Sequence, residues 1–311
     1  MPIFRVAVIV ALLSVCAAGQ VPLSNHVLLL VEENHSFESV IGSPQMPYLN
    51  SLARQYGLAV NYFANSHPSI PNYFELTAGQ GITRDDGTSQ IFNVDNLARD
   101  LLLAGKTWKS YADGLPAAGY TGGNNGAYAK HHNPFAYFTD VAGSSVEAAN
   151  LVQFSQFAID LANGQLPNFS FIVPDLLHDA HSASLASADV WLQQNIAPLL
   201  ANPSFQQDGI LIITFDESFG GDLRFGGGHV ATVVIGPTVR LGYQSTIFYQ
   251  HQNTLRTVEQ ALGLTAFTGD ALLAAPMADF FLPPPLTAPA PPVNPGPSPR
   301  NTPDPGSRGP R

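Results

Sequence analysis

Residues 26–37 read HVLLLVEENHSF, an apolar run followed directly by acidic and amide side chains. The apolar part, residues 26–31, predicts a strand, and Glu33 and Asn34 stand just past its carboxyl end. Side-chain oxygens that are fixed at the carboxyl end of a strand can hold a hard metal ion. The stretch therefore predicts a strand of the sheet and one half of a metal site.

A second stretch, residues 209–215, reads GILIITF and predicts another buried strand. Asp216 and Glu217 follow it immediately. Ligands of open α/β sheets bind beyond the carboxyl ends of the strands, where the loops of several strands meet. Two strand ends that each carry acidic side chains therefore predict one shared site.

Along the rest of the chain, strand-like apolar runs alternate with helical patterns, which predicts an α/β fold whose parallel strands are linked by crossovers. The other predicted strands cover residues 58–63, 107–111, 168–173 and 230–235. The predicted helices cover residues 46–56, 72–78, 96–104, 149–163, 184–200 and 252–262. Residues 114–139 are rich in Gly, Asn and aromatics and have no period, so we expect a long functional loop there.

The amino-terminal residues 1–19 have the pattern of a secretory signal peptide. Arg5 precedes the apolar run of residues 6–15, and small residues follow at 17–19. This run is shorter than the ~20 residues that a membrane-spanning helix needs. We therefore expect a secreted protein, periplasmic or extracellular. The only cysteine, Cys16, lies inside this leader, which leaves the mature chain without a disulfide or a thiol nucleophile.

Length and composition predict one catalytic domain over residues 20–282, because 311 residues with 45% hydrophobic content can fill one large core. Residues 283–311 are dominated by Pro, Ala, Gly, Ser and Thr, so we predict a disordered tail. The formal charge of −10 argues against nucleic acid as a partner, because a nucleic-acid binder needs a basic surface. The sequence does not predict an oligomeric state.

Residues 65–73, NSHPSIPNY, place Ser69 just ahead of a helix that Pro71 and Asn72 would start. A helix amino terminus offers unpaired N–H groups and a positive dipole, which suit a phosphate, so Ser69 is placed to attack phosphorus. The alternative is that Ser69 only caps the helix.

Histidines concentrate in segments that carry polar side chains. His131 and His132 lie in the long loop, His181 follows the predicted strand 168–173, and His229 comes after three glycines. One lone histidine is more often structural than catalytic, but several at strand ends and in one loop indicate a site.

Asp175 and Asp179 follow the same predicted strand as His181. They orient His181 or bind a second ion, or alternatively they cap the helix that comes next.

Taken in order, these motifs resemble the phosphoesterase family that unites bacterial and fungal acid phosphatases with non-specific phospholipases C. The resemblance rests on residues 33–37, 68–73, 131–135, 174–181 and 216–217, and on residues 253–259 and 275–281 near the end. Each motif alone is weak, but the ordered set is specific. Because this family belongs to the alkaline-phosphatase-like superfamily, the resemblance implies a three-layer α/β/α sandwich around a largely parallel sheet.

The resemblance also implies roles for individual residues. It makes Ser69 the nucleophile, and a histidine of the phosphate pocket the group that protonates the leaving alcohol. The implied metal ligands are Glu33, Asn34, Asp216 and Glu217; the pocket histidines are His131, His132 and His181; Asn72 and His229 are the implied substrate contacts. All-oxygen ligation favours Ca²⁺ or Mg²⁺, with Mn²⁺ or Zn²⁺ as alternatives if a histidine joins.

We therefore predict a secreted, metal-dependent phosphomonoesterase that acts on a small phosphate ester through a phosphoserine. The first alternative is a phospholipase C or other phosphodiesterase with membrane lipid as its partner. Its apolar entrance could be lined by aromatics of the long loop, which are Tyr120, Tyr128, Phe135, Tyr137 and Phe138, although such aromatics more often pack a loop onto the core. The second alternative is a secreted binding protein without turnover.

Overall fold

The computed structural model describes residues 20–283. The predicted signal peptide and all but the first residue of the predicted tail lie outside this range. In the described part, one sheet has the strand order β4-β3-β5-β1-β6-β7-β2-β8. Its strands are β1 (Val27–Glu32), β2 (Gly57–Ala59), β3 (Trp108–Ala112), β4 (Leu151–Gln153), β5 (Phe169–Val173), β6 (Ile210–Phe215), β7 (Thr232–Ile235) and β8 (Tyr243–Ser245). Only the pairings of β7 with β6 and with β2 are antiparallel, so the sheet is largely parallel as predicted.

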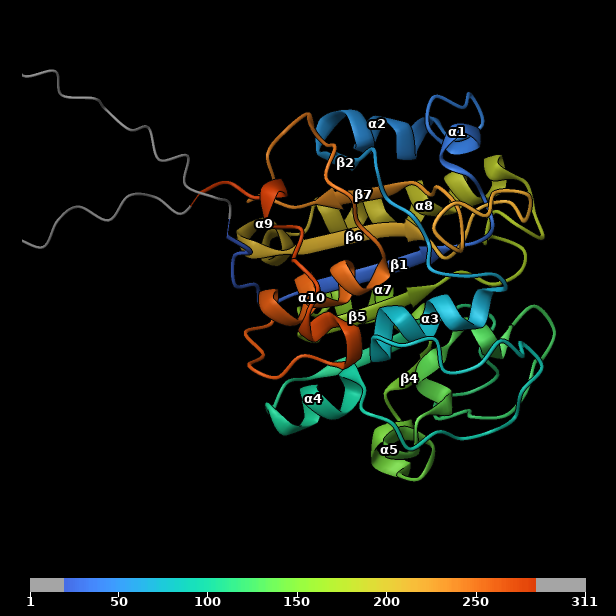
Figure 1. Ribbon diagram of the computed structural model, residues 1–311. Helices are drawn as coiled ribbons and strands as arrows, with labels where there is room; N and C mark the ends of the chain where they lie inside the picture. Colours follow the sequence, from blue (N-terminus) through green and yellow to red (C-terminus); the bar gives the residue numbers. More distant parts are fainter. Residues whose placement is uncertain (1–19, 284–311) are drawn as a thin grey trace, which may run out of the picture.

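Helices cover both faces of this sheet. They are α1 (Phe37–Val40), α2 (Pro47–Gln55), α3 (Ser69–Ala78), α4 (Leu97–Leu103), α5 (Thr139–Ala142), α6 (Ser145–Ala148), α7 (Ser155–Ala162), α8 (Leu185–Leu200), α9 (Pro203–Asp208) and α10 (His251–Ala261). Short 3₁₀ segments are Lys130–His132, Pro134–Tyr137, Gly269–Leu272 and Ala278–Phe280. Helices α3 and α10 pack together in front of the strands in Figure 1, whereas α2 packs on α8. The predicted three-layer α/β/α fold is confirmed.

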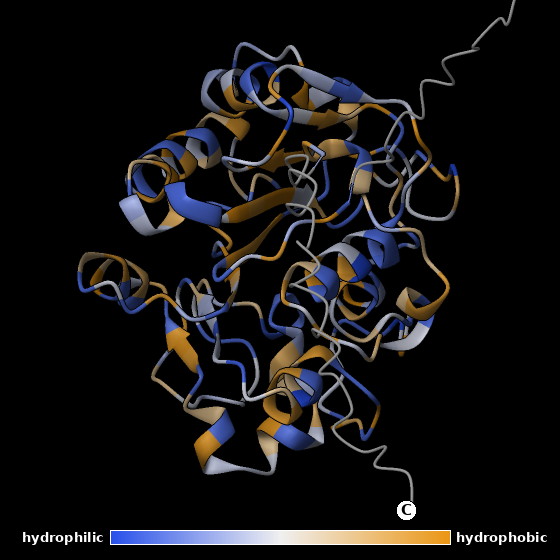
Figure 2. Cartoon of the chain, turned by 90° about the vertical axis from the view of Figure 1, so that its left-hand side faces the viewer, coloured by the Kyte–Doolittle hydropathy of each residue, from blue (hydrophilic) through white to orange (hydrophobic). Residues whose placement is uncertain are grey.

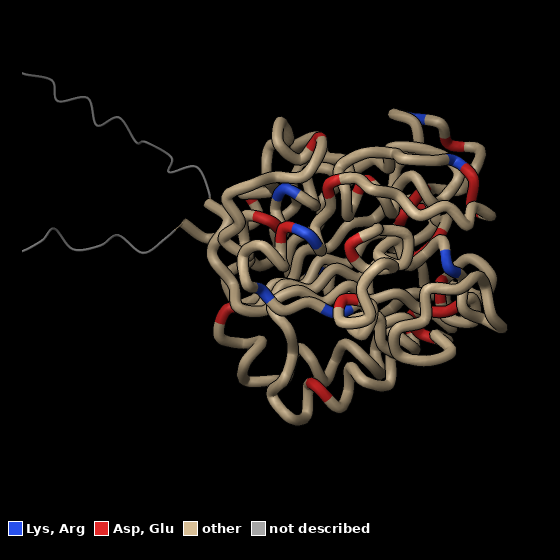
Figure 3. The backbone as a smooth tube through the Cα atoms, turned by 90° about the horizontal axis from the view of Figure 1, so that it is seen from below, with Lys and Arg blue, Asp and Glu red and all other residues tan. Residues whose placement is uncertain are grey.

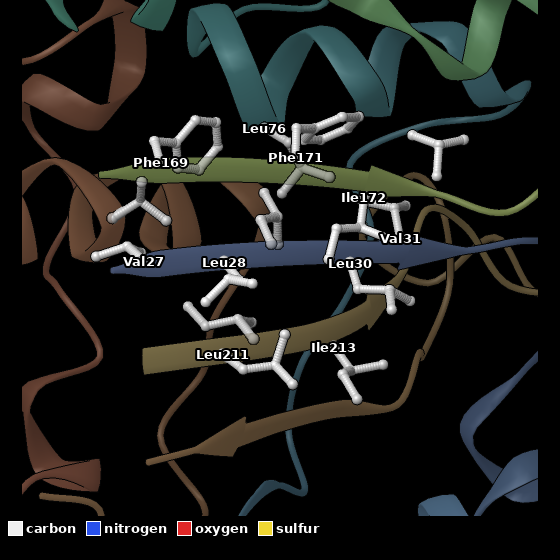
Figure 4. Packing of buried hydrophobic residues seen from close by; sticks show 14 of the residues in the cluster. Val27, Leu28, Leu30, Val31, Leu76, Phe169, Phe171, Ile172, Leu211 and Ile213 are labelled. Atoms are coloured by element: carbon white, nitrogen blue, oxygen red, sulfur yellow. The ribbon is translucent and has the colours of Figure 1, made fainter. Parts of the chain in front are cut away.

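The core is centred on β1, because this strand lies between β5 and β6 and all six of its residues are buried. The strands β5 and β6 are buried along their whole length as well. Figure 4 shows Leu28 and Leu30 among the side chains of β5 and β6, and Figure 2 shows that the central strands are apolar. Burial on both faces explains why these strands read as continuous apolar runs rather than as alternating patterns.

The buried carboxylate of Asp189 joins two helices of the α2 and α8 layer. Asp189 lies in α8, and its two oxygens each accept a hydrogen bond of 2.8 Å, one from the Tyr48 N–H and one from the Leu49 N–H. These N–H groups belong to the first turn of α2, where no intrahelical acceptor exists. The negative charge also suits the positive end of the helix dipole.

Several parts of the secondary-structure prediction are wrong. The predicted helix over residues 72–78 begins three residues earlier, at Ser69. The predicted helix over residues 149–163 is the edge strand β4 followed by α7, and β8 was not predicted. Both missed strands have only three residues, too few to show a period of two. The predicted strand over residues 58–63 ends at Ala59, although Tyr62 and Phe63 still form isolated bridges to Tyr249 and His229.

Four of the five predicted entrance aromatics are buried, whereas Tyr120 is half-buried. Phe135, Tyr137 and Phe138 are fully buried, and Tyr128 is nearly so. The Phe135 ring contacts Trp108 and Phe171 with centroid distances of 4.9 and 5.4 Å. These rings therefore pack the loop onto the sheet.

In the described residues, none of the helices is both long and apolar enough to span a membrane. Figure 3 shows Lys and Arg as isolated positions along the chain in that view. The prediction that nucleic acid is not a partner stays a prediction.

Leu30→Ala should lower the free energy of unfolding by about 2–5 kcal/mol, because Leu30 is fully buried in the central strand and its truncation leaves a cavity. Leu103→Ala is the matched control, because Leu103 is 79% exposed at the end of α4. It should change stability by less than about 0.5 kcal/mol. Urea unfolding monitored by fluorescence measures both, and equal losses would contradict this account of the core.

Candidate active site

The site is built where β1 and β6 end side by side. These strands are parallel, and Glu32 pairs in register with Phe215. Glu33 and Asn34 therefore lie beside Asp216 and Glu217, and the Asn34 N–H donates to Asp216 Oδ1 at 3.0 Å. The loops that follow the two strands gather at the right-hand edge in Figure 1. The structure thus brings together the four residues that were predicted as metal ligands.

Ser69 opens α3 and points its hydroxyl into this group of carboxylates. Its Oγ lies 3.2 Å from Glu33 Oε2 and 3.2 Å from Glu217 Oε1. Ser69 as a whole is only 5% exposed. The residue at the N-cap of α3 is Pro68, which makes no side-chain cap, and the Ser69 hydroxyl bonds the carboxylates instead of the helix. The contacts therefore favour a chemical role for Ser69 over the helix-cap alternative.

Asn72 has other contacts than the predicted phosphate oxygen. Its Oδ1 accepts from the N–H groups of Asn65 and Ser66 at 3.1 and 3.0 Å, and its Nδ2 donates to the carbonyl of Ser66 at 2.8 Å. The side chain is fully buried. In this structure Asn72 shapes the segment that presents Ser69, and both ends of its amide are occupied.

Two ring side chains contact Glu33, Tyr73 from α3 and His132 from the 3₁₀ segment Lys130–His132. The Tyr73 hydroxyl donates to Glu33 Oε1 at 2.5 Å, and His132 Nε2 lies 3.2 Å from the same oxygen. The Tyr73 and His132 rings stack with centroids 5.3 Å apart. Burial, with His131 and His181 nearby, holds the pKa of His132 well below its usual range, so this ring is neutral. His132 is therefore suited to positioning Glu33 rather than to protonating a leaving group.

The other two predicted pocket histidines are less enclosed. His181 is exposed, and its Nδ1 lies 2.9 Å from Asn34 Nδ2. His131 meets His132 edge-on with ring centroids 4.2 Å apart, and burial lowers its pKa. His181 thus lies at the exposed opening of the site.

His229 lies against other side chains. It stacks on Phe37 and Phe63, with centroid distances of 4.4 and 4.9 Å, and its Nδ1 lies 3.0 Å from Glu38. None of these partners contacts Ser69. The structure therefore does not bring His229 into the group around the nucleophile.

Tyr73 and His67 belong to the site, although neither was predicted as a functional residue. His67 Nδ1 contacts Glu217, and its Nε2 lies 2.9 Å from the carbonyl oxygen of Asp222. A signal did exist, because both residues lie in the segment that presents Ser69. A tyrosine and a histidine beside a predicted helix start are, however, equally typical of structural packing.

The carboxylates around Ser69 need a positive partner. Burial and the neighbouring Asp216 raise the pKa of Glu33, burial and Glu217 raise that of Asp216, and burial raises the pKa of Glu217 to about 8. The buried atoms Asn34 Oδ1 and Asp216 Oδ2 have no hydrogen-bond partner. Three carboxylates and a free amide oxygen form a donor set that fits an oxygen-preferring divalent ion.

A separate group, Asp113, Asp175 and His178, also has the composition of a metal site. Its ligand atoms lie within 4.8 Å of one another. His178 Nδ1 is 2.7 Å from Asp175 and 3.2 Å from Asp113, so the three side chains already contact one another. This triad does not include Ser69 or its partners.

Comparison with known sequences points to one chemistry. The Phosphoesterase family model matches residues 43–265. The chain is 36% identical to a phosphatidylinositol-3-phosphatase of Mycobacterium tuberculosis, over 85% of each chain. It is 32% identical to a phosphate-repressible acid phosphatase of Penicillium chrysogenum and 30% identical to a probable acid phosphatase of Kluyveromyces lactis, over 70% and 73% of this chain. The chain spans about half the length of these two fungal relatives, 54% and 55%.

Solved structures confirm the fold. A protein of the alkaline phosphatase superfamily from Vibrio parahaemolyticus superposes with a TM-score of 0.58 at 13% identity, covering 83% of this chain and 70% of the other. A phosphonate monoester hydrolase of Agrobacterium radiobacter gives 0.56 at 14% identity, covering 83% and 77%. At these identities the match shows the fold alone, and it confirms the predicted alkaline-phosphatase-like architecture.

His251 should make the protein less stable in acid. Its Nε2–H donates to the Asp216 carbonyl at 2.6 Å, and burial lowers its pKa to about 4 from an ordinary value of 6.5. The unfolded chain takes up this proton first, so stability falls as pH drops from about 6.5 toward 4, by on the order of 3 kcal/mol. In His251→Gln the loss over this range should be smaller by about that amount. Urea unfolding at pH 7 and pH 4.5 measures it, and an unchanged loss would refute this role.

Proposed function

This chain belongs to the Phosphoesterase family, whose members hydrolyse phosphoric esters, and we propose that it is a secreted, metal-dependent phosphomonoesterase that acts through a phosphoserine. The observation that carries the proposal is the Ser69 hydroxyl, which lies 3.2 Å from both Glu33 and Glu217 at the start of α3. The acid phosphatases among the relatives support a monoester substrate.

A divalent ion would be held by the side chains of Glu33, Asn34, Asp216 and Glu217. When bound, it would supply charge that neutralises the phosphate and lowers the pKa of the Ser69 hydroxyl. The amino terminus of α3 adds the positive end of its dipole for the same phosphate. The Ile70 N–H is already bonded to Asp86 Oδ1 at 3.0 Å, so the Ser69 N–H is the group of this turn that remains for the phosphate.

The reaction then uses residues of this chain. Ser69 gives its proton to one of the two carboxylates that it contacts, and its Oγ attacks phosphorus in line with the ester oxygen. The bond between phosphorus and the ester oxygen breaks, and the departing alkoxide takes a proton from His181 at the opening. Water next attacks the phosphoserine and gives a proton to His181, and the bond between phosphorus and Ser69 Oγ breaks. Ser69 Oγ takes back the proton that the carboxylate had accepted, which releases phosphate and restores the hydroxyl.

Ser69→Ala should lose nearly all phosphate release from a soluble aryl phosphate monoester, because no other group replaces the attacking oxygen. Ser51→Ala is the matched control, since the Ser51 hydroxyl bonds only the Tyr48 carbonyl in α2. A chelator should abolish the wild-type activity, and Ca²⁺ or Mg²⁺ should restore it. A Ser69→Ala enzyme that keeps more than about a tenth of the activity, a loss under ~1.4 kcal/mol, would contradict the proposal.

A lipid phosphate is a second candidate substrate, and two observations favour it. The relative that is 36% identical is named a phosphatidylinositol-3-phosphatase. The loop that begins just after Glu217 also exposes Phe219, Leu223 and Phe225, at 71%, 69% and 61%. Exposed apolar side chains beside a reactive centre suit a substrate that lies in a membrane surface.

Phe219→Ser with Leu223→Ser should therefore lower hydrolysis of phosphatidylinositol 3-phosphate in phosphatidylcholine vesicles at least about tenfold, a change of ~1.4 kcal/mol, while the rate on the soluble monoester stays unchanged. Leu102→Ser with Leu103→Ser is the control, because these exposed leucines lie on α4. Equal lipid rates in both double variants would remove this candidate. Release of diacylglycerol instead of inorganic phosphate would favour the phospholipase C alternative.

A further inference from the structure

Glu32 is a buried carboxylate that the proposed reaction does not use. It is the last residue of β1, it is fully buried, and neither of its oxygens has a hydrogen-bond partner among residues 20–283. Glu33, the next residue, contacts Ser69 and Tyr73 of α3. Glu32 instead has Asp179 and Asp189 as its charged neighbours, which add to the effect of burial in raising its pKa.

Asp179 has a free oxygen of the same kind. The side chain is fully buried, and its Oδ1 accepts from the N–H groups of His181 and Ser182, both at 3.0 Å. Its Oδ2 has no partner. The Glu33 N–H donates to the Asp179 carbonyl at 2.9 Å, so the turn that carries Asp179 lies directly against the end of β1.

Asp189 does not offer ligands to this place, because the N–H groups of α2 occupy both of its oxygens. Three free oxygens therefore remain, two from Glu32 and one from Asp179. Burying unpaired carboxylates costs several kcal/mol for each charge, roughly, unless a proton or cation compensates. In the described residues these three oxygens accept no hydrogen bond, so no protein donor compensates them.

We propose that Glu32 and Asp179 bind a divalent cation that prefers oxygen ligands, Ca²⁺ or Mg²⁺, at a second site separate from the carboxylates around Ser69. Such ions take carboxylate oxygens at about 2.0–2.6 Å from the metal. Buried water completes the coordination.

The ion has a structural role in this proposal. It joins the end of β1 to the turn that Asp179 begins, and that turn carries His181, whose ring meets Asn34. The cation therefore fixes the group at the opening of the active site relative to the metal-binding end of β1. This inference does not require that the chain be a phosphatase.

Equilibrium dialysis of the full chain tests the site. The protein is stripped of metal and dialysed against Ca²⁺ alone or Mg²⁺ alone, and the bound ions are counted by mass spectrometry. The test variant is Glu32→Gln, and Asp179→Asn repeats the test if the first variant does not fold. Glu259→Gln is the matched control, because Glu259 is also fully buried with one free oxygen, Oε2.

We expect Glu32→Gln to bind one ion fewer than wild type and Glu259→Gln to bind the same number. Asp216→Asn should keep the ion that Glu32→Gln loses, and Ca²⁺ should still raise its thermal midpoint. Wild type could also bind a single ion that is lost in Glu32→Gln but kept in Asp216→Asn. That result would support the inference and would contradict the proposed metal beside Ser69. An unchanged ion count in both Glu32→Gln and Asp179→Asn would overturn the inference.

Discussion

The site depends on the parallel pairing of β1 and β6. Their register places the carboxyl ends of the two central strands level with each other, so the acidic residues that follow must lie together. Glu33, Asp216 and Glu217 are all at most 5% exposed. Three like charges that are buried away from water repel one another strongly. The other residues of the site are groups that offset this repulsion.

These groups come from segments far apart in the chain. Tyr73 and His132 hold one oxygen of Glu33, the Asn34 N–H holds Asp216, and His67 contacts Glu217. Most of these partners are neutral donors, so they orient the carboxylates without cancelling their charge. The remaining requirement is a cation or protons, and the divalent ion that we propose would meet it.

The sequence predicts the parts of this architecture that depend on local pattern. The strands β1 and β6 are visible because fully buried strands need continuous apolar runs. Ser69 is visible because Pro71 and Asn72 predict a helix start nearby, although α3 begins at Ser69 itself. The strands β4 and β8 are not, because three residues carry no period. The roles of Tyr73, His67 and Asn72 depend on contacts across the fold. The family resemblance implies that Asn72 contacts the phosphate, yet its amide bonds the backbone beside Ser69.

Protons and the proposed divalent ion would compete for the same oxygens in this site. Because burial raises the pKa of Glu33, Asp216 and Glu217, the metal-free protein holds protons there at pH values where free carboxyls are ionised. Binding of the ion must release them, so metal affinity falls as pH falls. If the protein acts as an acid phosphatase, its metal binding at acidic pH therefore depends on how much of the repulsion between the carboxylates the neutral donors offset. The short hydrogen bond from Tyr73 to Glu33 acts in that direction, because it stabilises the ionised carboxylate and lowers the pKa that burial raises.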